Sequence, residues 1–241
     1  MSKYIDGVGE VDVPRTFKER LVNFWYHYKW HTVVALFLVV AILVCSLQFC
    51  AKKSYDVYVL YAGSKSIGRT TENGNPAEIA TIGSSLKRVA RDFDGDGEVV
   101  INFTNYIYYS SEELAELGAD VDPSYVSGDK SSLEGALNYS EYYLCFISPA
   151  VYEAYNYVGG LDMFVSLEEY KSVEGLDFYN GNAIKLSSTD FYSLPGISGL
   201  PEDTLICIKS PSVLAAKSKE HKKHISNAFD MLENIISYKN S

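Results

Sequence analysis

The sequence contains few of the residues that most often carry catalysis or bind metals. Its 241 residues include only 4 histidines, 4 cysteines and 3 methionines. No cysteine or histidine spacing matches a zinc site, no Gly-Lys-Ser order indicates a phosphate-binding loop, and no serine has the context of a nucleophile elbow. We therefore expect a protein that is not an enzyme. A cell-envelope hydrolase stays the least favoured alternative, since a triad can assemble from distant residues.

Two of the four histidines lie three residues apart near the end of the chain, at His221 and His224. A metal site would need a third ligand and an inward-facing side of the helix. Lysines surround both positions, at residues 217, 219, 222 and 223. This pattern predicts a solvated helix start rather than a metal site.

Positive charge is scarce beyond the first 51 residues. That segment holds five Lys/Arg and four Asp/Glu, a net charge of +1. Since the whole chain has a net charge of −10, the remaining 190 residues have a net charge of −11. An acidic surface repels nucleic acid and anionic lipid. We expect no nucleic-acid partner.

The cysteines do not form a disulfide framework. Cys45 and Cys50 belong to a long apolar segment, whereas Cys145 and Cys207 each lie in a strand-like run. A disulfide between the last two requires neighbouring strands outside the cell. Two buried free thiols are the favoured alternative, because few pairs of strand positions meet the geometry of a disulfide.

Long apolar runs are also absent, with one exception, from Thr32 to Ala51. About 20 uncharged residues suffice for a helix that spans the hydrocarbon core, where every backbone polar group must be paired internally. Signal peptidase requires small residues at −3 and −1, and Phe49 occupies −3 before Ala51. Neither Cys45 nor Cys50 follows the small residue of a lipoprotein signal. The run predicts an uncleaved, single-pass signal anchor.

The residues before this run predict a polar tail followed by an amphipathic helix. Thr16 and Glu19 have the spacing of a capping box. Four aromatic residues then approach the membrane: Trp25, Tyr26, Tyr28 and Trp30. Aromatic side chains of this kind prefer the headgroup layer. We expect an interfacial helix, with binding of a partner protein as the alternative.

Charge does not decide the orientation of the anchor. Four Lys/Arg lie within about 20 residues of each end of the span. We place the N-terminus in the cytoplasm because a short tail and one uncleaved apolar segment usually export the domain that follows. The tyrosine-rich, acidic composition of that domain is typical of an extracytoplasmic location. The expected localisation is therefore the cell membrane, with the domain outside.

Strand and helix patterns alternate after the anchor. Strands are expected over 56–62, 98–109, 142–148 and within 200–210, with a turn at Asn180-Gly181. Helices are expected over 77–93, 110–117, 132–139, 149–160 and from Ser218 onward, and residues 118–131 read as a loop. Alternation of this kind favours parallel pairing. The prediction is an α/β protein: a single three-layer domain with a mainly parallel sheet.

The expected elements follow one another in a familiar order. The segments are DVYVLYAG, SSLKRVARDF, GEVVINF and YYLCFISPAVYEAYNYVGG, then LICIKSPS and a long final helix. This order resembles one lobe of an extracellular solute-binding protein of the type that serves bacterial ABC transporters. The resemblance implies a lobe-like fold and solute binding, although 190 residues leave little room for the second lobe. FWYHYKWH before the span resembles membrane-anchored proteins of Gram-positive anaerobes, which implies no activity.

An acidic loop offers one candidate metal site, formed by Asp92, Asp94, Asp96 and Glu98. Three carboxylates at positions 1, 3 and 5, with Gly97 at position 6, resemble the start of an EF-hand calcium loop. Position 12 is Phe103 instead of a bidentate glutamate. The alternatives are a structural Ca²⁺ ion and a simple turn that joins helix to strand. The ligand count favours the turn.

A glycine-containing loop follows the first expected strand, formed by Gly63, Ser64, Lys65 and Ser66. In α/β sheets, ligands bind beyond the carboxyl ends of the strands. Its position makes this loop a candidate wall of a ligand pocket, whereas the alternative is an ordinary turn. We predict no other cofactor.

Taken together, these patterns predict three segments: a cytoplasmic tail over 1–31, a transmembrane helix over 32–51 and an extracytoplasmic domain over 52–241. The expected function is non-catalytic binding of a small solute or a protein. A structural or assembly component of a membrane or envelope protein complex is the main alternative. The lipid bilayer is the expected partner in either case.

Overall fold

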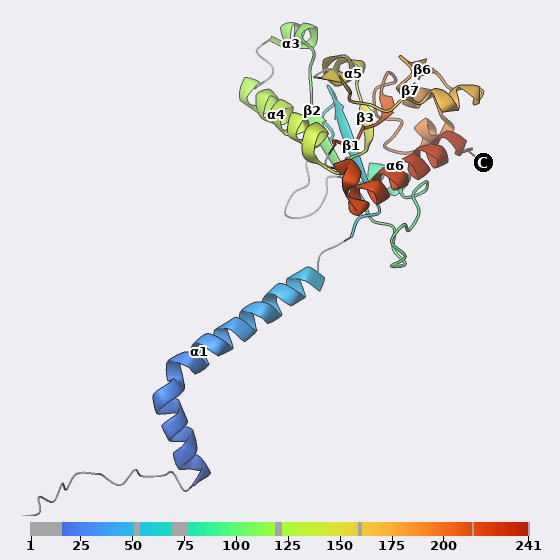
Figure 1. Ribbon diagram of the computed structural model, residues 1–241. Coiled ribbons are helices and arrows are strands. Elements are labelled where there is room, and N and C mark those ends of the chain that lie inside the picture. Colours follow the sequence, from blue (N-terminus) through green and yellow to red (C-terminus); the bar gives the residue numbers. More distant parts are fainter. Residues whose placement is uncertain are drawn as a thin grey trace, which may run out of the picture. The chain divides into compact units, whose positions relative to one another are not determined.

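The computed structural model describes residues 16–50, 54–68, 77–118, 122–158, 161–213 and 215–240 (Figure 1). The chain divides into two compact units, Met1–Lys53 and Ser54–Ser241. The first contains one long helix, and the second contains a mixed α/β domain.

The described part of the first unit is formed by α1, which runs over Phe17–Cys50. The backbone N–H of Glu19 donates to Thr16 Oγ1 at 3.3 Å, and Thr16 N–H donates to Glu19 Oε2 at 3.3 Å, which confirms the predicted capping box. The expected interfacial helix and span are thus one continuous helix. Its Phe17–Ser46 part is long and apolar enough to cross a membrane. All four aromatic residues, Trp25, Tyr26, Tyr28 and Trp30, are exposed on it.

The second unit alternates strands and helices in its first half and is more irregular in its second half. Its strands are β1 Val57–Gly63, β2 Ile101–Ile107, β3 Leu144–Ile147, β4 Tyr157–Val158, β5 Leu161–Asp162, β6 Phe178–Tyr179, β7 Ala183–Lys185 and β8 Leu205–Ile208. Its α-helices are α2 Ala77–Leu86, α3 Ser111–Leu117, α4 Pro123–Tyr139, α5 Pro149–Tyr155 and α6 Lys219–Ser237. Short 3₁₀ helices in the described part of this unit cover Glu168–Ser172, Leu186–Ser188, Asp190–Ser193 and Ala215–Lys217.

Six strands form one sheet, in the order β2-β1-β3-β8-β7-β6. Only β2, β1 and β3 are parallel, because β8 pairs antiparallel with β3 and β7, and β6 pairs antiparallel with β7. The predicted mainly parallel sheet is therefore wrong, and the sheet is mixed. After α5, a hairpin with positive φ at Asn180 and Gly181 joins β6 to β7, so these two strands pair antiparallel.

Buried side chains form two clusters that take alternate residues of the same strands. Val59 and Tyr61 belong to one cluster, with α2 and α6, whereas Leu60 and Ala62 belong to the other, with α4 and α5. Successive side chains of a strand point to opposite faces of a sheet. Helices therefore pack on both faces of the strand β1.

Several boundaries differ from the prediction: α5 ends at Tyr155 instead of residue 160, and β2 covers Ile101–Ile107 instead of 98–109. Helix α2 ends at Leu86 instead of continuing to residue 93, because Arg88 and Val89 close the chain into tight turns by donating to Ser85 O and Leu86 O. Helix α4 begins at Pro123, within the segment expected to be a loop. Asp122 caps it by accepting from Ser124 N at 2.8 Å, and proline suits a first helical position.

Cys145 and Cys207 lie directly opposite each other on β3 and β8. Both are free and completely buried. The strands are thus neighbours, as a disulfide would require, but the two residues are the buried thiols that the sequence favours.

Candidate functional site

The predicted ligand loop lies beyond the carboxyl end of β1. Lys65 Nζ forms an ion pair with Glu78 Oε1 at 2.5 Å and donates to Gly199 O at 2.8 Å. A Cβ atom at Gly63 would come within 2.8 Å of the Tyr61 hydroxyl, which explains the glycine there. The ammonium group of this loop is therefore used internally. Ligand binding by Gly63, Ser64, Lys65 and Ser66 stays a prediction.

The acidic loop uses most of its carboxylates to hold its own backbone. Asp92 accepts from the N–H groups of Gly95 at 2.6 Å and Gly97 at 2.8 Å. Asp94 accepts from Asp96 N, and Asp96 accepts from Glu98 N. These bonds form Asx-type turns.

A buried carboxylate that the sequence did not single out anchors this loop. Asp56 is 2% exposed and accepts from Phe93 N at 2.7 Å and Val100 N at 2.8 Å. Its oxygens lie within 4.8 Å of those of Asp92 and Asp94. Glu98 is not part of this group. Calcium binding by the loop stays a prediction.

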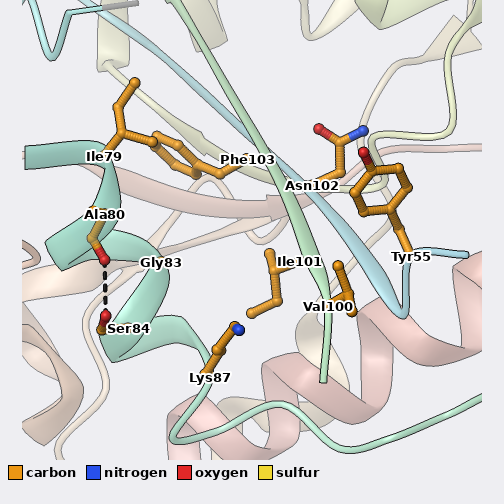
Figure 2. Close-up of a pocket in the computed structure, with 10 residues that line it drawn as sticks. All are labelled: Tyr55, Ile79, Ala80, Gly83, Ser84, Lys87, Val100, Ile101, Asn102 and Phe103. Carbon is orange, nitrogen blue, oxygen red and sulfur yellow. Dashed lines mark hydrogen bonds between the residues drawn. The ribbon is translucent and has the colours of Figure 1, made fainter. Parts of the chain in front are cut away.

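A groove of about 440 Å³ lies between α2 and β2 (Figure 2). It is lined by Tyr55, Ile79, Ala80, Gly83, Ser84, Lys87 and the four residues 100–103. The side chains of Ile79 and Phe103 point toward each other at one end, and Lys87 lies near Ile101 at the other (Figure 2). Small residues of α2 leave the space open between these ends.

The strand that forms one wall of the groove is at the edge of the sheet. In a parallel pair, successive residues direct their N–H and C=O groups alternately toward and away from the partner strand. Tyr108 N–H donates to Gly63 O, so the even-numbered residues of β2 face β1. Ile101, Phe103 and Asn105 therefore direct their backbone groups outward. Within the described ranges, no strand pairs with this outer edge.

Two features limit what the groove can bind. At the C-terminal end of β2, Ile107 N–H donates to Asp129 Oδ2 of α4 at 2.9 Å, so the backbone groups that are open to a partner end before Ile107. Among the described residues that line the groove, only Lys87 is charged. Free backbone groups and one cation suit an extended peptide that carries a carboxylate.

A second pocket, of about 360 Å³, lies where α4 ends and α6 begins. Its wall includes Tyr143, Lys209, His221 and the serines at 140, 210, 212 and 218. The Tyr143 hydroxyl and His221 Nδ1 are 2.6 Å apart and share one hydrogen bond. This pocket is rich in hydroxyl groups and suits a small polar molecule.

Lys209 forms the inner wall of the second pocket, although it is only 2% exposed. Its ammonium donates to Ser140 O at 2.7 Å and Ala136 O at 3.1 Å, the carbonyls at the end of α4. It also lies 5.1 Å from the centre of the Tyr143 ring. Burial lowers its pKa to about 8, while the neighbouring groups act weakly in the opposite direction.

The expectation that His221 and His224 form a solvated helix start is wrong. Helix α6 does begin after the cap Ser218, as expected. However, its first turns lie against β3 and β1, so that His221 meets Tyr143, and the ring of His224 packs at 5.0 Å against that of Tyr58. The histidine side of this turn faces inward, and the lysines occupy the other side.

Most residues of the groove and the second pocket were absent from the sequence-based candidates. The contacts join residues such as Tyr143 and His221 that are distant in sequence, so no local spacing indicates them. One signal was present: a lysine directly after the buried run LICI suggests an amphipathic strand end. The edge position of β2 depends on strand order, which a single sequence does not contain.

Comparison with protein-family models, with curated proteins and with solved structures finds no match to this chain.

Proposed function

We propose that this chain is a single-pass membrane protein whose extracytoplasmic, three-layer α/β domain binds an extended peptide segment of another protein. The groove between α2 and β2 is the proposed site. The observation that carries the proposal is the outer edge of β2, which pairs with no strand of the described residues and lies beside an open groove. We propose no catalytic step.

The free edge supplies a regular set of backbone partners. Ile101, Phe103 and Asn105 direct their N–H and C=O groups away from β1 at intervals of two residues. A partner strand bonds to an edge in this pattern, and pockets for its alternate side chains give selectivity. The half-buried side chains of Ile101 and Phe103 form the floor that such side chains would contact.

Charge selects the partner further. Lys87 is exposed at the end of α2, in a domain that is otherwise acidic. A carboxylate on the peptide, either a side chain or a chain end, complements this cation.

The membrane assignment rests on α1 and its aromatic residues. A helix with an apolar stretch of this length spans the hydrocarbon core, and exposed Trp25 and Trp30 suit the headgroup layer. With the N-terminus in the cytoplasm, the domain after residue 53 meets peptides of envelope or extracellular proteins.

The test selects ligands from a displayed library of random peptides, with free carboxyl ends, against the full-length chain in lipid nanodiscs. We expect selected peptides that carry a carboxylate and bind saturably. Ser84→Trp should fill the groove and weaken binding at least about tenfold, equivalent to about 1.4 kcal/mol. Lys87→Glu should weaken carboxylate-bearing peptides by a similar factor.

Ser132→Trp is the matched control. Ser84 and Ser132 are both exposed helical serines, and each hydroxyl donates to the carbonyl four residues earlier. Only Ser84 lines the groove. Equal losses in the two variants, or no selected peptide at all, would contradict peptide binding at this site.

The second pocket favours a second candidate function, the binding of a small polar solute. Tyr143, His221 and the surrounding serines offer hydroxyl and imidazole groups for hydrogen bonds. This candidate is closer to the solute-binding resemblance of the sequence. A thermal-shift screen with sugars and amino acids tests it, and stabilisation that Ser210→Trp abolishes would support it.

A further inference from the structure

A cluster of titratable side chains forms where α4 ends and α6 begins, beside the start of β1. Glu141 follows α4, and Glu220 and His224 belong to the first two turns of α6. One potential ligand atom from each of the three lies within 4.8 Å of the others. Glu220 and His224 are four residues apart, so they share one side of the helix.

His224 is the unusual member of this cluster. Its side chain is only 10% exposed, and its Nε2 lies 3.8 Å from Glu141 Oε2, which is too long for a hydrogen bond. Its Nδ1 is buried and has no hydrogen-bond partner among the described residues. Buried imidazoles normally satisfy at least one nitrogen. The ring packs against Tyr58, and its Nε2 lies toward the carboxylate of Glu141.

The groups around the ring fit a metal ligand. Burial lowers the pKa of His224, against the opposing effect of Glu141 and Glu220, and thus favours the neutral imidazole that a metal ligand requires. The Tyr58 ring packs on the imidazole at 5.0 Å between ring centroids, and the Glu141 carboxylate acts electrostatically on the Tyr58 hydroxyl. Such outer contacts fix the orientation of ligands. His221 and Lys223 are the other titratable groups that act on the ring.

We propose that Glu141, Glu220 and His224 bind one divalent transition-metal ion of the Zn²⁺ class. An imidazole nitrogen selects such ions over Ca²⁺ and Mg²⁺, which prefer oxygen ligands alone. Ligand atoms around tetrahedral zinc are roughly 3.4 Å apart, given metal bonds of about 2.0–2.1 Å. The two glutamates are partly exposed or exposed, so their side chains can close the remaining distance. Water completes the coordination.

The experiment uses Co²⁺ as the probe and the full-length chain in detergent, without a histidine tag. We expect one Co²⁺ per chain, with visible absorption bands of a four-coordinate ion that Zn²⁺ displaces. Glu141→Gln and Glu220→Gln should each weaken binding at least about tenfold while keeping the shape of the side chain. His224→Gln should abolish it.

Asp92→Asn is the control, since Asp92 belongs to the separate acidic group with Asp56 and Asp94. It should leave the Co²⁺ affinity unchanged. The proposal is overturned if Co²⁺ does not bind, if the affinity is equal in all variants, or if Asp92→Asn alone weakens it. Because Glu141→Gln and Glu220→Gln change side chains that are not buried, they decide the question even if His224→Gln does not fold.

Discussion

Replacing Lys209 by methionine removes a buried ammonium ion but keeps most of the side-chain volume. The ion lies 5.1 Å from the centre of the Tyr143 ring and holds two carbonyls at the end of α4, Ser140 O and Ala136 O. Burial lowers its pKa from 10.5 to about 8. We expect this single group to leave a measurable signature in the pH dependence of the unfolding free energy.

The sign follows from proton binding. Between pH 8 and 10.5 the unfolded chain holds a proton on Lys209 that the folded chain has lost, so the contribution of this group to stability rises with pH. One pKa unit corresponds to about 1.36 kcal/mol, which gives about 3 kcal/mol over the whole window. Between pH values of about 7.5 and about 9.5 the expected gain is about 2 kcal/mol.

Other groups act in the opposite direction at high pH. Burial raises the pKa of Cys145 to about 12 and also raises that of Cys207. These buried thiols contribute fully to the free energy of unfolding at pH values below the thiol pKa of the unfolded chain. Their contribution decreases as the pH rises above that pKa. Wild type and Lys209→Met both carry these thiols, so most of the thiol titration cancels in the difference between the two proteins. The difference then reports on the lysine together with its charge effect on Cys145, whose pKa is raised by burial and to a lesser extent lowered by the Lys209 ammonium.

The assay is urea unfolding of the full-length chain in detergent, followed by far-ultraviolet circular dichroism at both pH values. Tryptophan fluorescence does not report on the domain, because the chain has only 2 tryptophans, Trp25 and Trp30, and both lie in α1. Lys222→Met, at an exposed position, controls for the loss of one lysine. If the difference in unfolding free energy between wild type and Lys209→Met does not change with pH, the reasoning is refuted.

Three other substitutions or treatments test the packing of the domain. Asp56→Asn leaves one of two backbone N–H groups without an acceptor, so it should lower the free energy of unfolding in urea by about 2 kcal/mol. Asp96→Asn, at an exposed position, should lower it by less than about 0.5 kcal/mol. Equal losses in the two variants would contradict the anchoring role of Asp56. Gly196→Ala should lower the free energy of unfolding by about 2 kcal/mol, since φ is +78° and the new Cβ would lie 2.9 Å from a backbone nitrogen of α2. An unchanged midpoint of urea unfolding would argue against this contact. Cys145 and Cys207 should resist maleimide in the folded chain and react after unfolding, and peptide mass spectrometry separates them from the exposed Cys45. Labelling of Cys145 or Cys207 in the native chain would disprove their burial.

Local signals in the sequence predicted many of the elements correctly. Apolar runs such as 56–62 and 142–148 coincide with β1 and β3, and the caps at Ser110 and Ser218 begin helices where expected. Each of these depends on residues that are close in the chain, such as a hydroxyl and the N–H groups after it.

Properties that depend on distant residues were not predictable in this way. The antiparallel pairing of β8 with β3 follows from a strand order that no periodicity contains. For the same reason, the inward position of His224 depends on how α6 packs on Tyr58, and the surrounding lysines concealed it. The groove beside β2 likewise exists only because that strand lies at the edge of the sheet.

Residue-resolved hydrogen exchange of β2, with and without a selected peptide, tests peptide binding at the groove most directly. In the free chain, the amides of Ile101, Phe103 and Asn105 should exchange quickly, because they face outward, and those of residues 102, 104 and 106 should be protected by β1. Bound peptide should protect the three outward amides. Unchanged exchange at these amides under saturating peptide, or protection of all six in the free chain, would contradict binding by strand addition.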